Sequence, residues 1–280
     1  MGVAWRRVRD RFRAANIDTA DLDARLLAQR ALKLEPIQLM SREREPVDLG
    51  GLLELERFAE RRLAGEPVAR LLGEKPFWGF PMTLNAATLV PRPETEMLVA
   101  QGLVLVHGKP AQRILDLGTG SGAIAIALLN ELPQAAAMAT DISQAALDMA
   151  RENAKRNGVA SRMTFRQGDW WEAVPEEETF DLIVSNPPYI ATAVIETLAP
   201  EVKTHDPVLA LDGGMDGLEA YRKIAIQARR RLRPGGAIAL EIGSTQGPLV
   251  TKMMSRAGFS KVELLQDLAG LDRVVAASHF

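Results

Sequence analysis

The sequence predicts an α/β fold in which helices cover both faces of a mostly parallel sheet, preceded by a small helical bundle. From Glu94 onward, short apolar runs alternate with helical patterns, which is typical of parallel strands joined by crossover helices. A glycine-rich turn at residues 118–122 lies between one such strand and one such helix. The last two apolar runs, 261–265 and 272–277, are separated by a short link with Gly270, which favours an antiparallel hairpin at the sheet edge.

Residues 1–65 are predicted to form the helical bundle. Asp18 or Thr19 is expected to cap its second helix, and Gly65 to end its last one. Apolar residues recur at helical spacing in three sets, each expected to face one side of a helix: Trp5, Val8 and Phe12; Leu22, Leu26 and Leu27; and Leu52, Leu55 and Phe58. A dense run of arginines opens the bundle, and we interpret it as a solvated helix face rather than an RNA contact: Arg6, Arg7, Arg9, Arg11 and Arg13.

Residues 66–92 are predicted to link the bundle to the sheet domain, which spans residues 93–280. Two short runs around Pro81, at 77–80 and 82–84, are expected to pair as a hairpin within this linker. In the sheet domain a helix is expected at 123–132, and strands are expected at 113–117, 135–140, 163–167 and 180–185.

The glycine-rich turn predicts a ligand site. Glycines at a strand-to-helix turn let the backbone approach a ligand and leave helix N–H groups free to bind it. Gly118, Gly120 and Ala123 satisfy the loose dinucleotide pattern, but Asp116 before the turn and the additional Gly122 argue against it. A carboxylate there would repel a pyrophosphate, whereas it suits a ligand that carries an ammonium and a sulfonium. S-adenosylmethionine carries both.

The ends of the next two strands supply further candidate ligand contacts. Asp141 lies about 20 residues past the glycines and is predicted to accept the ribose hydroxyls. The alternative is that Asp141 caps the helix that begins near Ser143. Asp169 is placed to accept from the adenine amine, and Trp170 to pack on the adenine ring. Either Trp170 or Trp171 could instead belong to the core.

The segment Asn186-Pro187-Pro188-Tyr189 directly follows the apolar run 180–185. Neither proline has an N–H to continue a strand ladder, so the carbonyls of Asn186 and Pro187 are expected to remain free acceptors. The side-chain amide of Asn186 and the ring of Tyr189 complete a set of groups that can hold a planar –NH2 and cover its face. The segment predicts a site for an amide or amino nitrogen; the alternative is a proline-rich turn leaving a strand.

The order of these motifs resembles that of class I S-adenosylmethionine-dependent methyltransferases, and more narrowly that of the PrmC/HemK family of release-factor glutamine methyltransferases. The resemblance extends over essentially the whole chain. Three further segments match signatures of this family: Leu89–Glu96, Asp212–Leu218 and Leu240–Gly243. One departure is Asp206, which begins the segment 206–211 where the family usually has a glutamate. This change keeps the charge and shortens its reach.

The resemblance implies a seven-stranded Rossmann-like methyltransferase sheet, a substrate-recognising N-terminal bundle and S-adenosylmethionine as cofactor. It also implies the acceptor, which is the glutamine of the Gly-Gly-Gln loop in class I peptide chain release factors. An amide nitrogen is a poor nucleophile, so catalysis is expected to rest on alignment and on stabilising the positive charge that develops on nitrogen. Asn186, Pro187 and Tyr189 are the predicted catalytic residues, and together with Pro188 they are predicted to bind the substrate. Cofactor binding is predicted for Asp116, Gly118, Thr119, Gly120, Ser121, Gly122, Asp141, Asp169, Trp170 and Asn186.

Three other functions remain open. An exocyclic –NH2 of adenine or cytosine presents the same two hydrogens, but a flipped base needs a gripping basic surface, and no recognition insert separates the core motifs. A glutamine of a ribosomal protein would use the same catalytic motif. A degenerate cofactor-binding module is disfavoured by the intact Asp116, Asp141 and Asn186.

Composition limits the remaining possibilities. The 280 residues include no cysteine, which excludes a disulfide scaffold and thiol catalysis. His107, His205 and His279 lack metal-ligand spacing, so no metal site is expected. With no apolar run long enough to span a membrane and no signal-like start, we expect a soluble cytoplasmic protein with no membrane partner, and a monomer. The net charge of −2 argues against a stable nucleic-acid partner.

Overall fold

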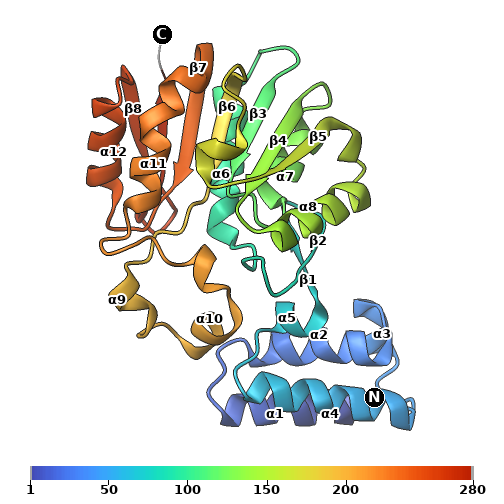
Figure 1. The fold of residues 1–280 in the computed structure, drawn as a ribbon. Coiled ribbons are helices and arrows are strands. Elements are labelled where there is room, and N and C mark those ends of the chain that lie inside the picture. Colours follow the sequence, from blue (N-terminus) through green and yellow to red (C-terminus); the bar gives the residue numbers. More distant parts are fainter. Residues whose placement is uncertain (1, 279–280) are drawn as a thin grey trace. The chain divides into compact units, whose positions relative to one another are not determined.

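The computed structural model describes residues 2–278, which divide into two compact units (Figure 1). One unit extends to Glu74 and also includes Pro200–His205; the other comprises Lys75–Ala199 and the residues from Asp206 onward. The predicted linker, residues 66–92, is therefore divided between the units rather than lying outside both. No helix in the described residues has both the length and the apolar character needed to cross a lipid bilayer.

The first unit is built from helices. Its elements are α1 (Gly2–Ala14), α2 (Ala20–Leu32), α3 (Pro36–Ser41), α4 (Leu49–Leu63), α5 (Val68–Leu72) and α10 (Pro200–His205). Trp5, Val8 and Phe12 are buried on one side of α1, as the helical spacing predicted. Leu55 and Phe58 are buried on α4, and Leu52 is half-buried. The buried side chains of α1 and α4 form part of a hydrophobic core within the unit.

The prediction for α2 was wrong in two respects. Leu22 is 57% exposed, and Leu26 is only half-buried. The buried face is formed largely by small residues, which allow neighbouring helices to approach closely: Ala20, Ala24, Leu27, Ala28 and Ala31. Thr19 occupies the N-cap position but makes no capping hydrogen bond, because its hydroxyl donates to Asp23 instead.

A buried ion-pair network joins three helices of this unit. Arg62 of α4 is only 6% exposed, and its Nε lies 2.8 Å from Oδ2 of Asp23 on α2. Its Nη1 lies 2.6 Å from Oε1 of Glu201 on α10. A buried guanidinium without acceptors would be costly. The Arg62–Glu201 ion pair therefore helps to explain why α10 belongs to the helical unit. Along the chain, α10 begins 126 residues after Glu74, where the first stretch of that unit ends.

The second unit contains a seven-stranded sheet in the order β5-β4-β3-β6-β7-β9-β8. Its strands are β3 (Arg113–Leu117), β4 (Ala136–Asp141), β5 (Met163–Gln167), β6 (Phe180–Ser185), β7 (Leu232–Glu241), β8 (Lys261–Gln266) and β9 (Asp272–Ser278). Strands β3 to β7 are parallel, while β9 runs antiparallel to both β7 and β8. A separate two-stranded sheet joins β1 (Glu74–Phe77) and β2 (Phe80–Thr83). Both the parallel sheet and the final antiparallel hairpin were predicted from the sequence.

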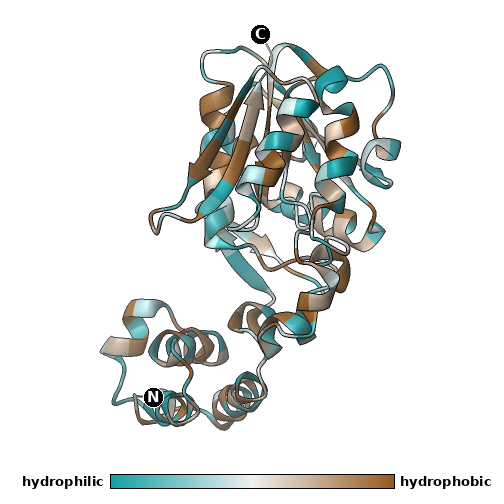
Figure 2. Ribbon diagram, turned by 90° about the vertical axis from the view of Figure 1, so that its left-hand side faces the viewer, coloured by the Kyte–Doolittle hydropathy of each residue, from teal (hydrophilic) through white to brown (hydrophobic). Residues whose placement is uncertain are grey.

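Helices cover both faces of the sheet. Helices α6 (Glu96–Leu105), α7 (Ala123–Glu131) and α8 (Gln144–Arg156) contribute to one core cluster, and α11 (Glu219–Ala228) and α12 (Gly247–Arg256) to the other. The remaining short helix is α9 (Thr192–Ile195). Alternate residues of one strand enter opposite clusters: Ile114 enters the first, and Leu115 and Leu117 enter the second. In Figure 2 the strands of the sheet are largely hydrophobic and the helices carry both kinds of residue.

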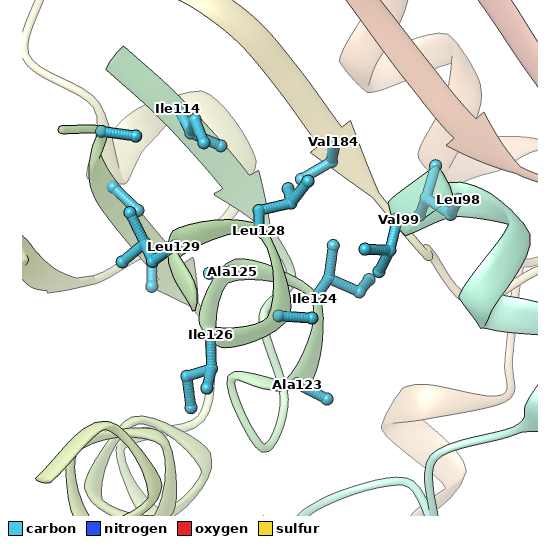
Figure 3. Close-up of a cluster of buried hydrophobic side chains, with 14 of the residues drawn as sticks. Leu98, Val99, Ile114, Ala123, Ile124, Ala125, Ile126, Leu128, Leu129 and Val184 are labelled. Atoms are coloured by element: carbon cyan, nitrogen blue, oxygen red, sulfur yellow. The ribbon is translucent and has the colours of Figure 1, made fainter. Parts of the chain in front are cut away.

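Helix α7 lies in the middle of the first cluster. Seven of its nine residues are buried, which agrees with its nearly continuous apolar sequence. Figure 3 shows Ile124 close to Val99 of α6, and Leu128 beside Val184 of β6. Burial on all sides holds the amino end of α7 rigidly, and the glycine-rich turn leads directly into that end.

Candidate active site

A cavity of about 370 Å³ opens at the carboxyl ends of the parallel strands. It lies where the strand order reverses between β3 and β6, which is where open α/β sheets bind ligands. Its volume falls in the usual range for small-molecule sites, roughly 300–1,000 Å³. Its walls include the following predicted site residues: Gly118, Thr119, Gly120, Ser121, Asp141, Asp169, Trp170, Asn186 and Pro188.

The glycine-rich turn forms one wall of the cavity. Gly118, Gly120 and Gly122 have φ values of +72°, +56° and +81°, a conformation that other residues rarely adopt. A Cβ added to Gly120 would meet no atom within 4 Å, so the backbone there is open to a ligand. A Cβ on Gly122 would instead lie 3.1 Å from the Cβ of Ala150, so this glycine permits close packing of α7 against α8. Gly122 does not line the cavity in the described part of the chain.

Asp116 lies behind this turn rather than on the cavity wall. Its side chain is fully buried, and Oδ2 accepts a 2.7 Å hydrogen bond from Thr119 Oγ1. Thr119 itself lines the cavity, so Asp116 is placed to act on a ligand through the threonine. Burial raises the pKa of Asp116 to about 7 despite the hydrogen bond from Thr119. Within residues 2–278 its Oδ1 is buried without a hydrogen-bond partner.

The raised pKa of Asp116 predicts a specific dependence of stability on pH. Between about pH 4 and pH 7 the folded protein keeps a proton on Asp116 that the unfolded chain has released, so the free energy of unfolding falls as pH rises through this window. Asp116→Asn removes the titration. Relative to this variant, wild type should lose on the order of 1–4 kcal/mol of stability between pH 5 and pH 8. Denaturant unfolding at both pH values measures this difference, and a difference that is the same at both would contradict the burial of an ionisable Asp116.

Asp141 ends β4 and lines the cavity. Its Oδ2 accepts from the backbone N–H of Gly120 at 2.9 Å, and its Oδ1 from that of Ser143 at 2.9 Å. The helix-cap alternative is wrong, because the N-cap of α8 is Ser143, whose Oγ accepts from Ala146. Burial raises the pKa of Asp141, and its backbone hydrogen bonds oppose that rise. Each carboxylate oxygen has a further lone pair available to a ligand.

Asp169 and Trp170 follow β5 and also line the cavity. The Nζ of Lys223, on α11, lies 3.0 Å from Oδ2 of Asp169, and this hydrogen bond raises the pKa of Lys223. Trp170 has a φ of +50°, and its ring would lie 3.7 Å from a Cβ on Gly118, so the glycine leaves room for the indole. Trp171 belongs to the core, where its Nε1–H donates to the Lys223 carbonyl at 2.9 Å.

Asn186 follows β6 and faces the same cavity. Its Nδ2 donates to Oγ1 of Thr95 at 3.2 Å. Among residues 2–278, no loop or side-chain hydrogen bond ends on the carbonyls of Asn186 or Pro187. Pro188 lines the cavity, whereas Pro187 and Tyr189 are not among its lining residues in the described part of the chain. The Tyr189 ring packs against the second core cluster, and burial raises the pKa of its hydroxyl.

The segment 212–218 packs directly against the proline-rich segment. A Cβ on Gly213 would lie 2.8 Å from the Pro188 carbonyl oxygen, and one on Gly217 would lie 2.4 Å from the Tyr189 carbonyl oxygen. Only glycine fits at such distances from backbone atoms. Gln246 Nε2 adds a 3.0 Å hydrogen bond to the same Tyr189 carbonyl. The two sequence motifs therefore form one rigid wall.

Asp206, which departs from the family pattern, is buried beside the cavity. Its Oδ2 lies 2.7 Å from Nη2 of Arg92, a residue that lines the cavity. The neighbouring Lys75 Nζ donates to the Pro91 carbonyl at 2.6 Å. Burial lowers the pKa of Lys75, and repulsion by Arg92 adds to this effect. The shorter side chain of Asp206 therefore still reaches Arg92, which lies in the segment Leu89–Glu96.

The prediction of site residues from the sequence missed Thr95, Lys223 and Glu241. Thr95 and Lys223 line the cavity, and Glu241 is buried close to Thr95 and Asn186. Glu241 lies within the family-signature segment 240–243, so the sequence marked its position but gave no chemical role for its side chain. In residues 2–278 no three His, Asp or Glu side chains are grouped so as to hold a metal ion, and His279 lies outside the described residues.

Comparisons with known proteins agree with this architecture. Two family models match the chain: the PrmC N-terminal domain over residues 4–73, and the methyltransferase small domain over residues 95–204. A solved methyltransferase from Pyrococcus furiosus covers 80% of this chain and 98% of its own, with a TM-score of 0.53 and 18% identity, which supports the fold alone.

Curated relatives are considerably closer in sequence. The release factor glutamine methyltransferase of Cereibacter sphaeroides is 46% identical over 267 residues, which cover 95% of this chain and 94% of the relative. That of Caulobacter vibrioides is 42% identical over 272 residues, covering 97% and 94% respectively. With this identity over nearly the full length of both proteins, the chain belongs to the release factor glutamine methyltransferase family.

Proposed function

We propose that this protein transfers a methyl group from S-adenosylmethionine to the side-chain amide nitrogen of the glutamine in the Gly-Gly-Gln motif of class I peptide chain release factors. The observation that carries the proposal is Asn186, whose amide is anchored through Nδ2 on the wall of a cavity that also contains the glycine-rich turn and Asp141. The names of relatives at 42% and 46% identity supply the acceptor.

The residues present fit S-adenosylmethionine. The open backbone at Gly120 suits close approach by the cofactor, and Asp141 has lone pairs for the ribose hydroxyls. Asp169 and Trp170 would hold the adenine, and Asp116 would favour the cationic end through Thr119. When bound, this cofactor supplies an electrophilic methyl group on a sulfonium.

The protein's own groups then act on the acceptor amide. The Oδ1 of Asn186 and the carbonyl of Pro187 would accept its two hydrogens, which aims the nitrogen lone pair along the line of transfer. As positive charge develops on that nitrogen, the same acceptors stabilise it without reorganising. Pro188 would complete the binding surface for the glutamine side chain, and Tyr189, whose ring packs on the second core cluster, would support it. No general base is required before transfer, because the amide nitrogen loses its proton only after it has been methylated.

The bound acceptor is proposed to be a protein rather than a nucleic acid. Four of the five N-terminal arginines lie beside carboxylates, in the pairs Arg6–Glu43, Arg9–Asp10, Arg11–Glu56 and Arg13–Asp21. These ion pairs reduce the positive charge available for a phosphate backbone. The glutamine of a ribosomal protein remains the second candidate, since the site chemistry is the same. We also propose that the enzyme acts as a monomer in the cytoplasm, where release factors work.

Methyl transfer from radiolabelled S-adenosylmethionine tests the acceptor. We expect label on a class I release factor, and little or none on ribosomal protein or on DNA supplied at equal concentration. A release factor whose motif glutamine is changed to glutamate should accept no label, because it lacks both amide hydrogens and would bring a carboxylate against two carbonyl acceptors. Equal labelling of the glutamine and glutamate forms would rule out the proposed reaction.

A further inference from the structure

Glu241 is a buried carboxylate immediately behind Asn186. Glu241 ends β7. Ser185 of β6 pairs with Leu240 of β7, so the residues that follow them, Asn186 and Glu241, lie side by side. The side chain is 3% exposed, and it lies close enough to Thr95 and Asn186 for both to lower its pKa. The hydroxyl of Thr95 accepts from Nδ2 of Asn186 at 3.2 Å, so the three side chains lie together. Oε2 of Glu241 is buried without a partner in residues 2–278.

We propose that Glu241 is a positioning residue which, together with the Thr95 hydroxyl, fixes the orientation of the Asn186 amide so that its oxygen faces the acceptor nitrogen. This inference deepens the proposed function and rests on it for the identity of the acceptor. The orientation itself is a property of the protein and is measurable without any acceptor.

The orientation matters because an asparagine amide has two chemically opposite ends. An ionised carboxylate only accepts hydrogen bonds, so Glu241 can bind Nδ2 of Asn186 but repels Oδ1. With Nδ2 held by Thr95 and, as proposed, by Glu241, Oδ1 would be directed to the cavity, where it could accept a hydrogen from the substrate –NH2. A flipped amide would present its own N–H groups to the substrate N–H groups, which would oppose binding and transfer. Glu241 also adds negative charge behind the site where positive charge develops.

Charged and titratable groups face Glu241 from several elements. Glu94 precedes α6, Arg273 lies on β9, Tyr189 follows β6, and the Tyr221 hydroxyl of α11 donates to the Glu241 carbonyl at 2.9 Å. Burial raises the pKa of Glu241 to about 7, the hydrogen bond from Thr95 lowers it, Glu94 raises it and Arg273 lowers it. As pH falls through neutrality the carboxylate takes up a proton and loses its charge, so its hold on Asn186 weakens.

The first experiment needs no acceptor. In full-length protein labelled with ¹⁵N, we expect the side-chain amide resonance of Asn186 to shift across neutral pH with a midpoint near the Glu241 value of about 7. In Glu241→Gln this titration should disappear, and in Thr95→Ser, which keeps the hydroxyl, it should remain. An Asn186 amide that does not titrate in wild type, or that titrates unchanged in Glu241→Gln, overturns the proposal.

The second experiment measures single-turnover transfer to a release factor at saturating cofactor. Glu241→Gln should lower the rate roughly 10-fold and remove the loss of rate toward acid pH, while cofactor affinity stays within about twofold. Thr95→Val should lower the rate similarly, and Thr95→Ser should restore it. The matched control is Asp181→Asn, which changes a carboxylate at the opposite end of β6 that accepts from the Arg113 N–H at 2.7 Å. Its transfer rate should match that of wild type.

These readouts separate the two proposals. If wild type does not methylate the release factor, the proposed function fails, and the Asn186 titration still decides the role of Glu241. If wild type is active and Glu241→Gln retains its rate and pH profile, the positioning role fails and the function stands. Should Glu241→Gln not fold, the Thr95→Val and Thr95→Ser pair decides, because equal rates in these two variants overturn the network.

Discussion

Asn186→Ala is expected to reduce methyl transfer to a release factor by about 100- to 1,000-fold, the usual effect of removing one preorganised group that stabilises charge in a transition state. The alanine variant loses the amide oxygen that is proposed to face the acceptor, and it leaves the Thr95 hydroxyl without its donor. Because the contact strengthens only as charge develops on nitrogen, the loss should fall on the rate of the chemical step. Single-turnover rates at saturating release factor and cofactor measure it.

The matched control is Asn130→Ala. Asn130 lies on α7 and donates from Nδ2 to the Ile126 carbonyl at 2.9 Å, so this variant removes an asparagine amide outside the cavity. Its transfer rate should remain near that of wild type. Cofactor affinity of Asn186→Ala should change far less than its rate, since the glycine-rich turn and Asp141 are untouched. A single-turnover rate for Asn186→Ala equal to wild type would exclude Asn186 from the reaction.

The strands of the sheet were predictable because each is a short apolar run bounded by turn-forming residues. The runs 113–117, 163–167 and 180–185 coincide with β3, β5 and β6 at both ends. Two prolines end β6 because neither can donate to the sheet. Helix α2 was harder, because the prediction followed the bulk of Leu22. The structure buries alanines instead, since close helix packing depends on small side chains as much as on large ones.

The site was predictable only where its residues lie next to strand ends along the sequence. The glycine-rich turn, Asp141 and Asn186 each follow a recognisable strand and reach the same cavity. Thr95 lies 91 residues from Asn186, and it directly precedes α6, which packs against β6 and β7. Asp116 shows a different limit of prediction from the sequence. Its position before the turn was evident, but its side chain enters the core behind the turn and contacts Thr119.

Asp141→Ala is expected to weaken S-adenosylmethionine binding by about 100-fold or more. Two hydrogen bonds from the ribose to a charged acceptor are each worth roughly 1.5–3 kcal/mol, and a 1.4 kcal/mol loss corresponds to tenfold in the dissociation constant. The structure adds a second reason, because Asp141 also accepts from the N–H of Gly120 at 2.9 Å and so holds the turn that faces the ligand. The loss of affinity should therefore exceed the loss expected from the two ribose hydrogen bonds alone. Isothermal titration calorimetry measures the affinity.

Two further variants separate these contributions. Asp141→Asn keeps an acceptor oxygen for the Gly120 N–H but removes the charge, so its affinity should lie between those of wild type and Asp141→Ala. Asp148→Ala removes an exposed carboxylate of α8 that pairs with Arg151 at 2.7 Å, and its affinity should equal that of wild type. An unchanged dissociation constant for a folded Asp141→Ala would rule out the ribose assignment. In that case the two backbone hydrogen bonds of Asp141, to Gly120 and Ser143, would be its whole contribution, and it would act only on the shape of the turn.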